Sequence, residues 1–532
     1  MFEWFRKKKN HQKEGRGNIK VSIAIPVYNA GNHIHAALDS LQNQTMPKAD
    51  FEIICVNDQS TDDSEAVIKR YQEKMDNLIL INREENSGGP MTPRNDAIRA
   101  ARGKYLLFLD NDDFIGKETL ERFYKAAEKH QSDVIFGKYV GVNGRGVPQS
   151  QFKRGNRPKA DILKDNLVFT LAPHKMFRLS FLRENGFEFH PKAVVGEDQL
   201  FVMQCYIRAK VITVLADYDY YYVVSRGNEN LSLKYFPAEE FFFSFNRIME
   251  FIEASDLNSL YKKKVKMAFI NRFLHASRLR SYLLSPTRLT PPQKREWLAA
   301  SKEFFDTHLT DEDLQKVKPH FRYFVDICKE NNLEKLLDIN QKMEKLTAKD
   351  VTKVENGFIY ARFSRMDKEL AYDEEYIVNG MNASTVFIND FKFGRVCFLN
   401  VDFHQSLLSS FPVQHRLVFI HRKTGREVRG DSQSKTDFKI DIEKLLIEHR
   451  LTGPWDLFIE GEINGYKHRR RLGASRANHI EKQEPIKTEY SGEHYSIKPY
   501  YTQNFDNLSF DVKVLHKKKD KEEGTAYSKM GR

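Results

Sequence analysis

The sequence predicts an amino-terminal α/β domain with a mostly parallel sheet, then a helical region, then an all-β region folded as a sandwich. Short apolar runs alternate with amphipathic helical patterns up to about residue 136, which is typical of βαβ units. From about residue 235 to 350 the apolar residues recur at helical spacing, and after residue 351 they alternate in short runs. A chain of 532 residues is also too long for one core, so several domains are expected.

The strands of the first domain are expected at residues 21–25, 51–56, 78–82, 105–109 and 133–136, where apolar residues cluster. Helices are expected from Asn32, from Ser60 to about Met75, over 93–102 and over 117–129. Ser60 and Asp63 are spaced as a capping box that opens the second helix. Parallel sheets bind ligands at the carboxyl ends of their strands, so the residues directly after each strand are the first candidates for a site.

The spacing of apolar residues changes twice in the remainder of the chain. Phe241, Phe245, Ile248 and Ile252 recur at helical spacing, which indicates core packing rather than a cofactor site. Later strands are expected at 385–388, 396–401, 417–420, 438–442, 455–459, 467–472, 496–500 and 508–515. The expected domains are a basic tail (1–18), an α/β domain (19–234), a helical region (235–350), a β-sandwich (351–480), and a further β-rich segment with a basic tail (481–532).

Composition limits the class of partner. The net charge is +12, from 85 Lys+Arg against 73 Asp+Glu, which favours an acidic partner. No nucleic-acid-binding module is recognisable, and no apolar run is long enough to span a membrane. The four cysteines lie far apart without metal-ligand spacing, which indicates a reduced, cytoplasmic protein. The start of the chain, with Phe2, Trp4 and Phe5 before a basic run, is either a solvated tail or a short interfacial anchor.

The strongest chemical signal is the acidic sequence Asp110-Asn-Asp-Asp113. Three carboxylates within four residues repel one another, and a divalent cation with oxygen ligands would compensate them. Such a cation can also stabilise the charge of a departing nucleoside diphosphate. An exposed acidic turn is the plain alternative, but the preceding Leu107-Phe-Leu109 predicts a buried strand and so favours the metal site.

Two further clusters follow strands. Asp58 can accept hydrogen bonds from a uracil or ribose edge, or can simply cap a turn. Gly88 and Gly89 permit a close backbone approach, and Arg94 near a helix amino terminus offers positive charge to a phosphate. A structural turn with a surface arginine explains the same residues, and these residues alone leave both interpretations open.

Together these segments resemble the family-2 inverting glycosyltransferases of the GT-A fold, over roughly residues 20–220. The segments that carry the resemblance are Val21–Asn29, Val56–Asp62, Asn86–Asn95 and Leu107–Asp113. The resemblance implies a UDP-sugar donor and Mn²⁺ or Mg²⁺. It would place these residues at the nucleotide, ribose or diphosphate: Pro26, Tyr28, Asp58, Asn86, Arg94 and Asp110. Asp112 would ligate the metal.

The same resemblance implies a general base. Gly196-Glu-Asp-Gln-Leu-Phe201 matches the E-D position of the family, with Asp198 as the base and Glu197 beside it. Ordinary acidic capping of a helix is the alternative. The Q-x-x-R-W sequence of the family's processive synthases is absent, which favours addition of single sugars.

A closer resemblance concerns the acceptor. Val140–Ser150, Glu197–Phe201 and Phe269–Arg272 are similar to the bacterial poly(ribitol-phosphate) N-acetylglucosaminyltransferases that decorate wall teichoic acid. This implies an anionic poly(alditol phosphate) acceptor, a peripheral position at the inner membrane face, carboxy-terminal immunoglobulin-like sandwiches and a homotrimer. The residues expected at acceptor phosphates are Arg226, Arg272 and Arg278, the last two about two turns apart on one helix.

The chain departs from that family at one position. The relatives carry a histidine after the base that completes their metal site, whereas this chain offers Asn230. The preferred hypothesis is transfer of a sugar to a ribitol- or glycerol-phosphate polymer, with N-acetylglucosamine as the first candidate and glucose or N-acetylgalactosamine as the others. The alternatives are transfer to a capsular or lipid-linked saccharide, and a non-catalytic oligomeric scaffold. The scaffold is disfavoured because Asp110, Asp112 and Asp198 occur in the expected order.

Overall fold

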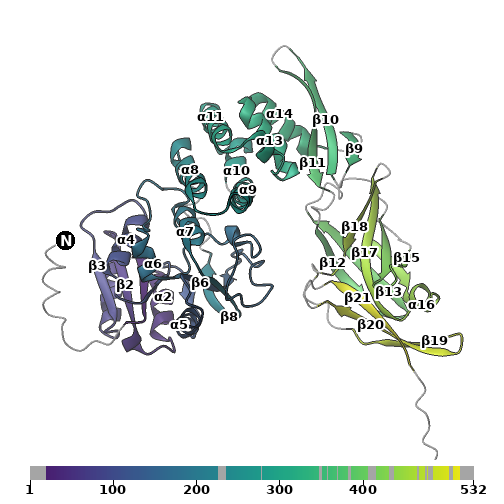
Figure 1. Ribbon diagram of the computed structural model, residues 1–532, viewed down its shortest axis with the longest axis horizontal. Helices are drawn as coiled ribbons and strands as arrows, with labels where there is room; N and C mark the ends of the chain where they lie inside the picture. The colour runs from purple at the N-terminus through teal and green to yellow at the C-terminus, as the bar shows by residue number, and fades with distance from the viewer. Residues whose placement is uncertain are drawn as a thin grey trace, which may run out of the picture. The chain divides into compact units, whose positions relative to one another are not determined.

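The computed structural model divides into two compact units, residues 1–318 with 325–333 and residues 319–324 with 334–532 (Figure 1). It describes residues 19–225, 235–276, 278–346, 350–355, 358–367, 370–380, 385–404, 415–430, 436–463, 466–473, 476, 483–502 and 507–515. Within these residues, no helix combines the length and apolar character needed to cross a membrane.

The first unit contains an eight-stranded mixed sheet with the order β3-β2-β1-β4-β7-β6-β8-β5. Its strands are β1 (Val21–Val27), β2 (Phe51–Asn57), β3 (Leu78–Asn82), β4 (Tyr105–Phe108), β5 (Phe114–Ile115), β6 (Val134–Val142), β7 (Met176–Arg178) and β8 (Ile212–Val224). β1, β2, β3 and β4 are parallel, as are β6 and β8, whereas β7 runs antiparallel to β4 and β6. This is the α/β GT-A arrangement that the sequence predicted.

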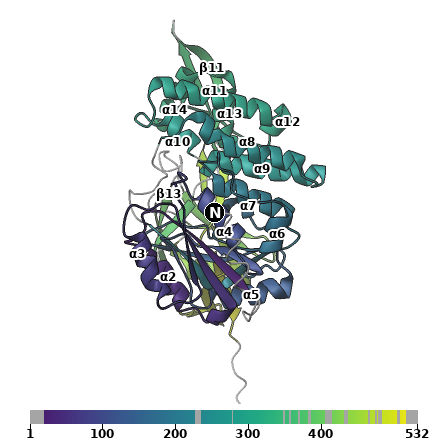
Figure 2. The same ribbon diagram turned by 90° about the vertical axis from the view of Figure 1, so that its left-hand side faces the viewer.

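Helices pack against this sheet. They are α2 (Ile34–Gln42), α3 (Ser64–Gln72), α4 (Met91–Ala100), α5 (Thr119–His130), α6 (Leu179–Glu184) and α7 (Glu197–Arg208), with short 3-10 turns at Lys48–Asp50 and Leu167–Phe169. In Figure 2, α2 and α3 lie side by side, and the Tyr71 hydroxyl of α3 donates a 2.7 Å hydrogen bond to Asp39 of α2.

The expected capping box at the start of α3 is wrong. The helix begins at Ser64, and the Asp63 side chain makes no capping hydrogen bond. The Ser60 hydroxyl instead accepts a 3.0 Å hydrogen bond from the Asn29 amide, which ties the loop after β2 to the loop after β1. Two other helices begin at residues other than the expected ones. α2 begins at Ile34, after His33, rather than directly after Asn32, and α4 begins at Met91 rather than at residue 93.

An aromatic cluster joins β4 to the helix that carries the predicted base. The Phe108 ring at the end of β4 contacts Phe177, Phe189 and Phe201 at centroid distances of 5.8, 5.4 and 5.7 Å. Phe201 lies on α7 and stacks on Phe189 at 4.1 Å. These contacts hold the amino end of α7 beside the carboxyl end of β4, so residues after β4 and residues at the start of α7 meet.

The helical region begins with α8 (Ala238–Ala254), α9 (Ser259–Ala276), α10 (Leu279–Leu284), α11 (Pro291–His308) and α12 (Asp311–Leu314), followed by α13 (Pro319–Glu330) and α14 (Leu333–Glu344). The predicted stripe is confirmed as core, since Phe241, Phe245, Ile248 and Ile252 are all buried. The expectation that Arg272 and Arg278 share one helix is wrong, because α9 ends at Ala276 and Arg278 precedes α10.

The second unit is rich in β-structure. A three-stranded sheet holds β9 (Val351–Glu355), β10 (Phe358–Met366) and β11 (Ala371–Gly380), and another holds β12 (Thr385–Lys392), β13 (Val396–His404) and β16 (Asp437–Asp441). A seven-stranded sheet holds β14 (His415–His421), β15 (Glu427–Gly430), β17 (Gly453–Ile463), β18 (Tyr466–Arg471), β19 (Ile486–Tyr490), β20 (Glu493–Tyr501) and β21 (Leu508–Val514). A short helix, α16 (Ile442–Ile447), follows β16.

One hydrophobic core is shared by the sheet of β12, β13 and β16 and the seven-stranded sheet. Buried side chains of β12, β13 and β16 pack in one cluster with those of β14, β17, β20 and β21. The strands expected as a separate segment after residue 481 belong to the seven-stranded sheet, where β21 pairs with β17. The strands after residue 481 therefore belong to the same domain as the strands before them, because they share its sheet and its core.

Candidate functional site

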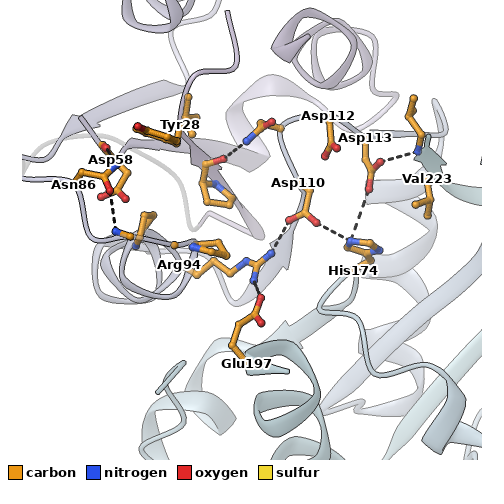
Figure 3. A pocket seen from close by; sticks show the side chains of 18 of the residues that line it. Tyr28, Asp58, Asn86, Arg94, Asp110, Asp112, Asp113, His174, Glu197 and Val223 are labelled. Carbon is orange, nitrogen blue, oxygen red and sulfur yellow. Dashed lines mark hydrogen bonds and ion pairs between the residues drawn. The ribbon is translucent and has the colours of Figure 1, made fainter. Parts of the chain in front are cut away.

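A pocket of about 770 Å³ lies at the carboxyl ends of β1, β2 and β4 (Figure 3). The residues lining it include eight that the sequence singled out: Pro26, Tyr28, Asp58, Asn86, Arg94, Asp110, Asp112 and Glu197. Asp198 and Arg272 do not line the pocket wall. The strand ends therefore converge as expected, with Glu197 of α7 reaching the same cavity.

One end of the pocket combines a fixed carboxylate with an exposed ring. Asp58 accepts hydrogen bonds from the Ser87 amide at 3.0 and 3.1 Å and from the Ser87 hydroxyl at 2.8 Å, and it pairs with Arg83 at 2.8 Å. Asn86 donates to the Asp58 carbonyl at 2.8 Å, which ties the loop after β3 to the end of β2. Tyr28 is 51% exposed at the rim. This end can stack a planar ring and accept a hydrogen bond from it.

The other end of the pocket is acidic. Asp110 pairs with Arg94 at 2.8 Å through one oxygen and with His174 Nε2 at 2.9 Å through the other. His174 also lies 3.7 Å from Asp113, and its ring stacks on Tyr221 at a centroid distance of 4.3 Å. Asp113 accepts a 2.8 Å hydrogen bond from the Val224 amide, so it links this turn to the end of β8. Dashed lines in Figure 3 mark the contacts of Asp110 with Arg94 and His174 and the contact of His174 with Asp113.

Burial and charge shift the pKa values of these carboxyls in opposite directions. Burial raises the pKa of Asp113 to about 6, with His174 opposing the shift and Asp110 adding to it. Burial also opposes ionisation of Asp110, but the charge of Arg94 and the hydrogen bond to His174 outweigh it and hold that pKa well below its usual range. Asp110 is therefore a permanent anion, whereas Asp113 titrates just below neutral pH.

Arg94 connects this turn to α7. Its side chain is only 5% exposed, and it pairs with Asp110 at 2.8 Å and with Glu197 at 3.5 Å. The alternative of a surface arginine is thus wrong, because the guanidinium is buried between two carboxylates and stacked 5.1 Å from the Phe189 ring. Gly196, with φ of +74°, allows the sharp turn that starts α7 with these two acids.

The two acids of α7 form a buried pair. Burial raises the pKa of Glu197 to about 7, helped by the negative charge of Asp198 and opposed by Arg94. The pKa of Asp198 is also raised, first by burial, while Arg94 and Arg272 oppose the shift. Two neighbouring carboxyls with raised pKa values are typical of a site that moves a proton near neutral pH.

Of the three arginines expected at acceptor phosphates, Arg272 and Arg278 lie among the described residues. Arg272 donates a 2.5 Å hydrogen bond to Gln199, one residue beyond Asp198, and burial lowers its pKa to about 10. Arg278 lies at the start of α10, half-buried. Arg226 and Asn230 fall outside the described residues, so the structure gives no placement for either.

Sequence reasoning missed two residues of the pocket with charged or titratable side chains, His174 and Arg145. His174 precedes β7, whose antiparallel pairing with β4 places Met176 opposite Leu107, so the residue lies at the carboxyl edge of β4. Arg145 follows β6 in a turn where Asn143 and Gly144 both have positive φ. The expected strand at 133–136 was too short, because β6 runs on to Val142 and carries Arg145 to the pocket.

Comparison with known proteins places this site in a family. Residues 22–187 match the model of glycosyl transferase family 2, residues 238–340 the glycosyl transferase TarS linker domain, and residues 385–512 the TarS beta-glycosyltransferase C-terminal domain 1. A poly(ribitol-phosphate) beta-glucosyltransferase of Bacillus spizizenii is 38% identical over 516 residues, covering 93% of this chain and 78% of the relative. The chain belongs to the poly(ribitol-phosphate) glycosyltransferases of family 2.

Further relatives agree with this assignment. The poly(ribitol-phosphate) beta-N-acetylglucosaminyltransferase TarS of Staphylococcus aureus is 31% identical over 510 residues, 92% of this chain and 84% of the relative. The crystal structure of S. aureus TarS matches with a TM-score of 0.72 at 26% identity, over 94% of this chain and 86% of that one. TarS 1–349 in complex with UDP-GlcNAc matches with a TM-score of 0.60 at 30% identity, over 67% of this chain and 99% of that one. The protein is a family-2 hexosyltransferase, which confirms the resemblance and the enzyme class predicted from the sequence.

Proposed function

We propose that this hexosyltransferase moves a sugar from a UDP-sugar to poly(ribitol phosphate) of wall teichoic acid, with inversion at the anomeric carbon. The observation that carries the proposal is the single pocket in which a ring-binding end, Tyr28 with Asp58, faces an acidic end, Asp110 to Asp113. A nucleoside diphosphate has a planar base at one end and phosphates at the other, so its length and polarity suit this pocket. The UDP-GlcNAc complex of TarS supports the same donor class.

The nucleotide would bind along the strand ends. Tyr28 is exposed for stacking on uracil, and Asp58 and Asn86 offer hydrogen-bonding groups to its edge. Pro26 forms the floor, where its carbonyl accepts a 2.8 Å hydrogen bond from Asn111. Asp110 would meet the ribose or the diphosphate, with Arg94 fixing its orientation.

The donor set at the acidic end fits a divalent cation. Asp110, Asp113 and His174 each offer a ligand atom, and these atoms lie within 4.8 Å of one another. Asp112 lines the same pocket and remains the ligand that the family resemblance implies. Carboxylate oxygens with one imidazole suit Mn²⁺, and Mg²⁺ would use the oxygens. When bound, the cation would stabilise the charge of the leaving diphosphate. His174 would supply an imidazole donor in addition to the side-chain oxygen that Asn230 offers.

Asp198 is the proposed base. It would remove the proton from the acceptor hydroxyl as that oxygen attacks the anomeric carbon and the bond to the diphosphate breaks. Glu197, paired with Arg94 on the pocket wall, would position the donor side of the site. Arg272 lies beside this region and, with Arg278 and Arg226, would bind acceptor phosphates.

Activity should depend on pH through the pair of acids on α7. We expect kcat/KM for the acceptor to fall on the acidic side of the profile, because Asp198 accepts a proton only when ionised and burial raises its pKa. Glu197→Gln removes one negative charge beside Asp198, so the acidic limb should move to lower pH. Rates measured from pH 5 to 9 at saturating donor and Mn²⁺ would test this, and an unchanged limb in the variant would contradict it.

Arg145 should contribute to donor affinity. It is exposed at the pocket, and no carboxylate among the described residues pairs with it. We expect Arg145→Ala to raise the donor KM about tenfold with little change in kcat, the loss of one charge-assisted hydrogen bond. Lys153→Ala, which removes an exposed cation outside the pocket, is the matched control. A donor KM equal to that of the control would argue against contact with the donor.

Three donors and two acceptors need to be separated by experiment. The sequence favoured N-acetylglucosamine, but glucose is a second candidate because the 38% identical relative is a beta-glucosyltransferase. UDP release with Mn²⁺ should be measured for UDP-GlcNAc, UDP-GalNAc and UDP-glucose with poly(ribitol phosphate) and poly(glycerol phosphate). Acceptor-dependent release that disappears in Asp198→Asn supports the proposal. Release with neither polymer would move the acceptor to a capsular or lipid-linked saccharide.

The assembly and location remain part of the proposal. The core shared by the sheet of β12, β13 and β16 and the seven-stranded sheet supports an immunoglobulin-like sandwich. The family resemblance supports a homotrimer built through this region. A cytoplasmic enzyme at the inner membrane face would meet both UDP-sugar and the growing polymer. Mass measurement of the intact protein in solution would test the trimer.

A further inference from the structure

One face of the seven-stranded sheet in the second unit presents a group of arginines, here called the arginine face. Its members lie on or beside β14, β15 and β18: Arg416, Arg422, Arg429, Arg469 and Arg471. Strand register places Arg416, Glu460 and Arg469 in one row across β14, β17 and β18. Arg429 and Arg471 lie in the adjacent row, across β15, β14, β17 and β18. Neighbouring rows on one face are about 7 Å apart.

Carboxylates beneath the guanidinium groups hold them in place. Glu460, only 1% exposed, pairs with Arg469 at 2.6 Å, with Arg416 at 3.5 Å and with Arg429 at 3.9 Å. Asp456, 13% exposed, pairs with Arg422 at 2.5 Å and also with Arg471. Glu427 is bound by Arg469, with one of the two contacts at 2.6 Å. The arginines are therefore fixed before any ligand arrives.

The charge that reaches the surface is positive. The side chains of the five arginines are 28–49% exposed, whereas two of the three carboxylates are nearly covered. Five positive and three negative charges leave the face with a net charge of +2. A guanidinium has five N–H donors, so an arginine bound to one carboxylate keeps donors for a second anion, and its planar fork matches a phosphate. Ion pairs with a purely structural role would need one arginine for each carboxylate. This face has five arginines for three carboxylates.

We propose that the arginine face is a second binding site for the acceptor, where it holds phosphate groups of the polymer other than those of the repeat that reacts. This rests on the proposed function, in which the acceptor is a chain of phosphodiesters. The donor pocket belongs to the first compact unit and the arginine face to the second. A polymer that binds both becomes tethered, so its effective concentration at the catalytic site rises with its length. A single-repeat acceptor has too few phosphates to bind both sites at once, so it gains nothing from the face.

The test uses the full chain with the triple substitution Arg416→Gln, Arg422→Gln and Arg429→Gln. Arg469 and Arg471 remain, so Glu460 and Asp456 each keep an ion pair while the net charge of the face changes from +2 to −1. The control is Lys392→Gln, Lys439→Gln and Lys444→Gln, which removes the same charge from exposed positions on β12, β16 and α16. Binding is measured with long poly(ribitol phosphate) and with inorganic polyphosphate, and transfer is measured on long and single-repeat acceptors.

We expect the arginine variant to bind both polymers about tenfold more weakly, with a shallower salt dependence, and to transfer normally to the single-repeat acceptor. Unchanged polymer binding, or an equal loss on long and short acceptors, would overturn the proposal. If the wild type transfers no sugar to poly(ribitol phosphate) but the variant still loses polyphosphate binding, the face stands and the acceptor assignment fails. If the glutamine variant does not fold, the three corresponding lysine substitutions replace it. They keep the charge but lose the fork, so polymer binding as tight as wild type would then contradict the proposal.

Discussion

Replacing Asp198 by asparagine is expected to lower kcat about 10³-fold while UDP-sugar binding is unchanged. The substitution keeps the size of the side chain and an oxygen that can accept the 2.7 Å hydrogen bond from the Gln199 amide. It removes the group that takes the acceptor proton. Because Asp198 does not line the donor pocket, the dissociation constant for UDP should stay at the wild-type value. Calorimetry with UDP and single-turnover rates with donor and acceptor would measure the two quantities separately.

Glu197→Gln is the control that distinguishes the two neighbouring acids. Glu197 lines the pocket and pairs with Arg94 at 3.5 Å, so its loss should affect donor binding and the pH profile more than the chemical step. The opposite result, with kcat abolished in Glu197→Gln and retained in Asp198→Asn, would reverse the two roles. Equal losses in both variants would indicate that the pair shares the proton rather than that one residue acts alone.

The pocket could be predicted from the sequence because it depends on local rules. Apolar runs located the parallel strands, and in a parallel sheet the residues after each strand meet at one edge. Asp58, Asn86 and Asp110 follow three different strands, and the structure places them in one cavity. The prediction that Glu197 joins them came from the family resemblance, and the physical cause is the aromatic cluster around Phe108.

The missed residues depend on features that a sequence pattern does not carry. The direction of β7 is set by its pairing with β4, so nothing in the sequence around His174 indicates which edge of the sheet it reaches. The end of β6 was placed too early because Gly137 and Lys138 interrupt the apolar run, although the backbone continues in the strand. The helix thought to hold both Arg272 and Arg278 ends at Ala276, since helical spacing alone did not reveal the break.

The cation site gives the second large effect. We expect His174→Ala to raise the Mn²⁺ concentration needed for half-maximal activity at least about tenfold, because it removes one of three ligand groups that lie within 4.8 Å of one another. Direct titration with Mn²⁺, monitored by electron paramagnetic resonance, would show the same loss of Mn²⁺ affinity in the absence of substrate. His190→Ala, at a half-buried histidine whose ring contacts Phe243, is the control for loss of a histidine elsewhere in the unit. Equal Mn²⁺ affinity in the two variants would exclude His174 as a ligand.

Asp113 allows the same site to be tested through pH. Its pKa is raised to about 6, so its carboxyl becomes protonated as the pH falls through that value and can no longer bind a cation well. Mn²⁺ affinity should therefore decrease below about pH 6 in the wild type. Asp113→Asn should bind Mn²⁺ more weakly than the wild type and lose the part of this dependence that comes from Asp113. Its side-chain oxygen can still accept the hydrogen bond from the Val224 amide. A variant that keeps both the wild-type affinity and its pH dependence would show that the cation is held by other ligands without Asp113.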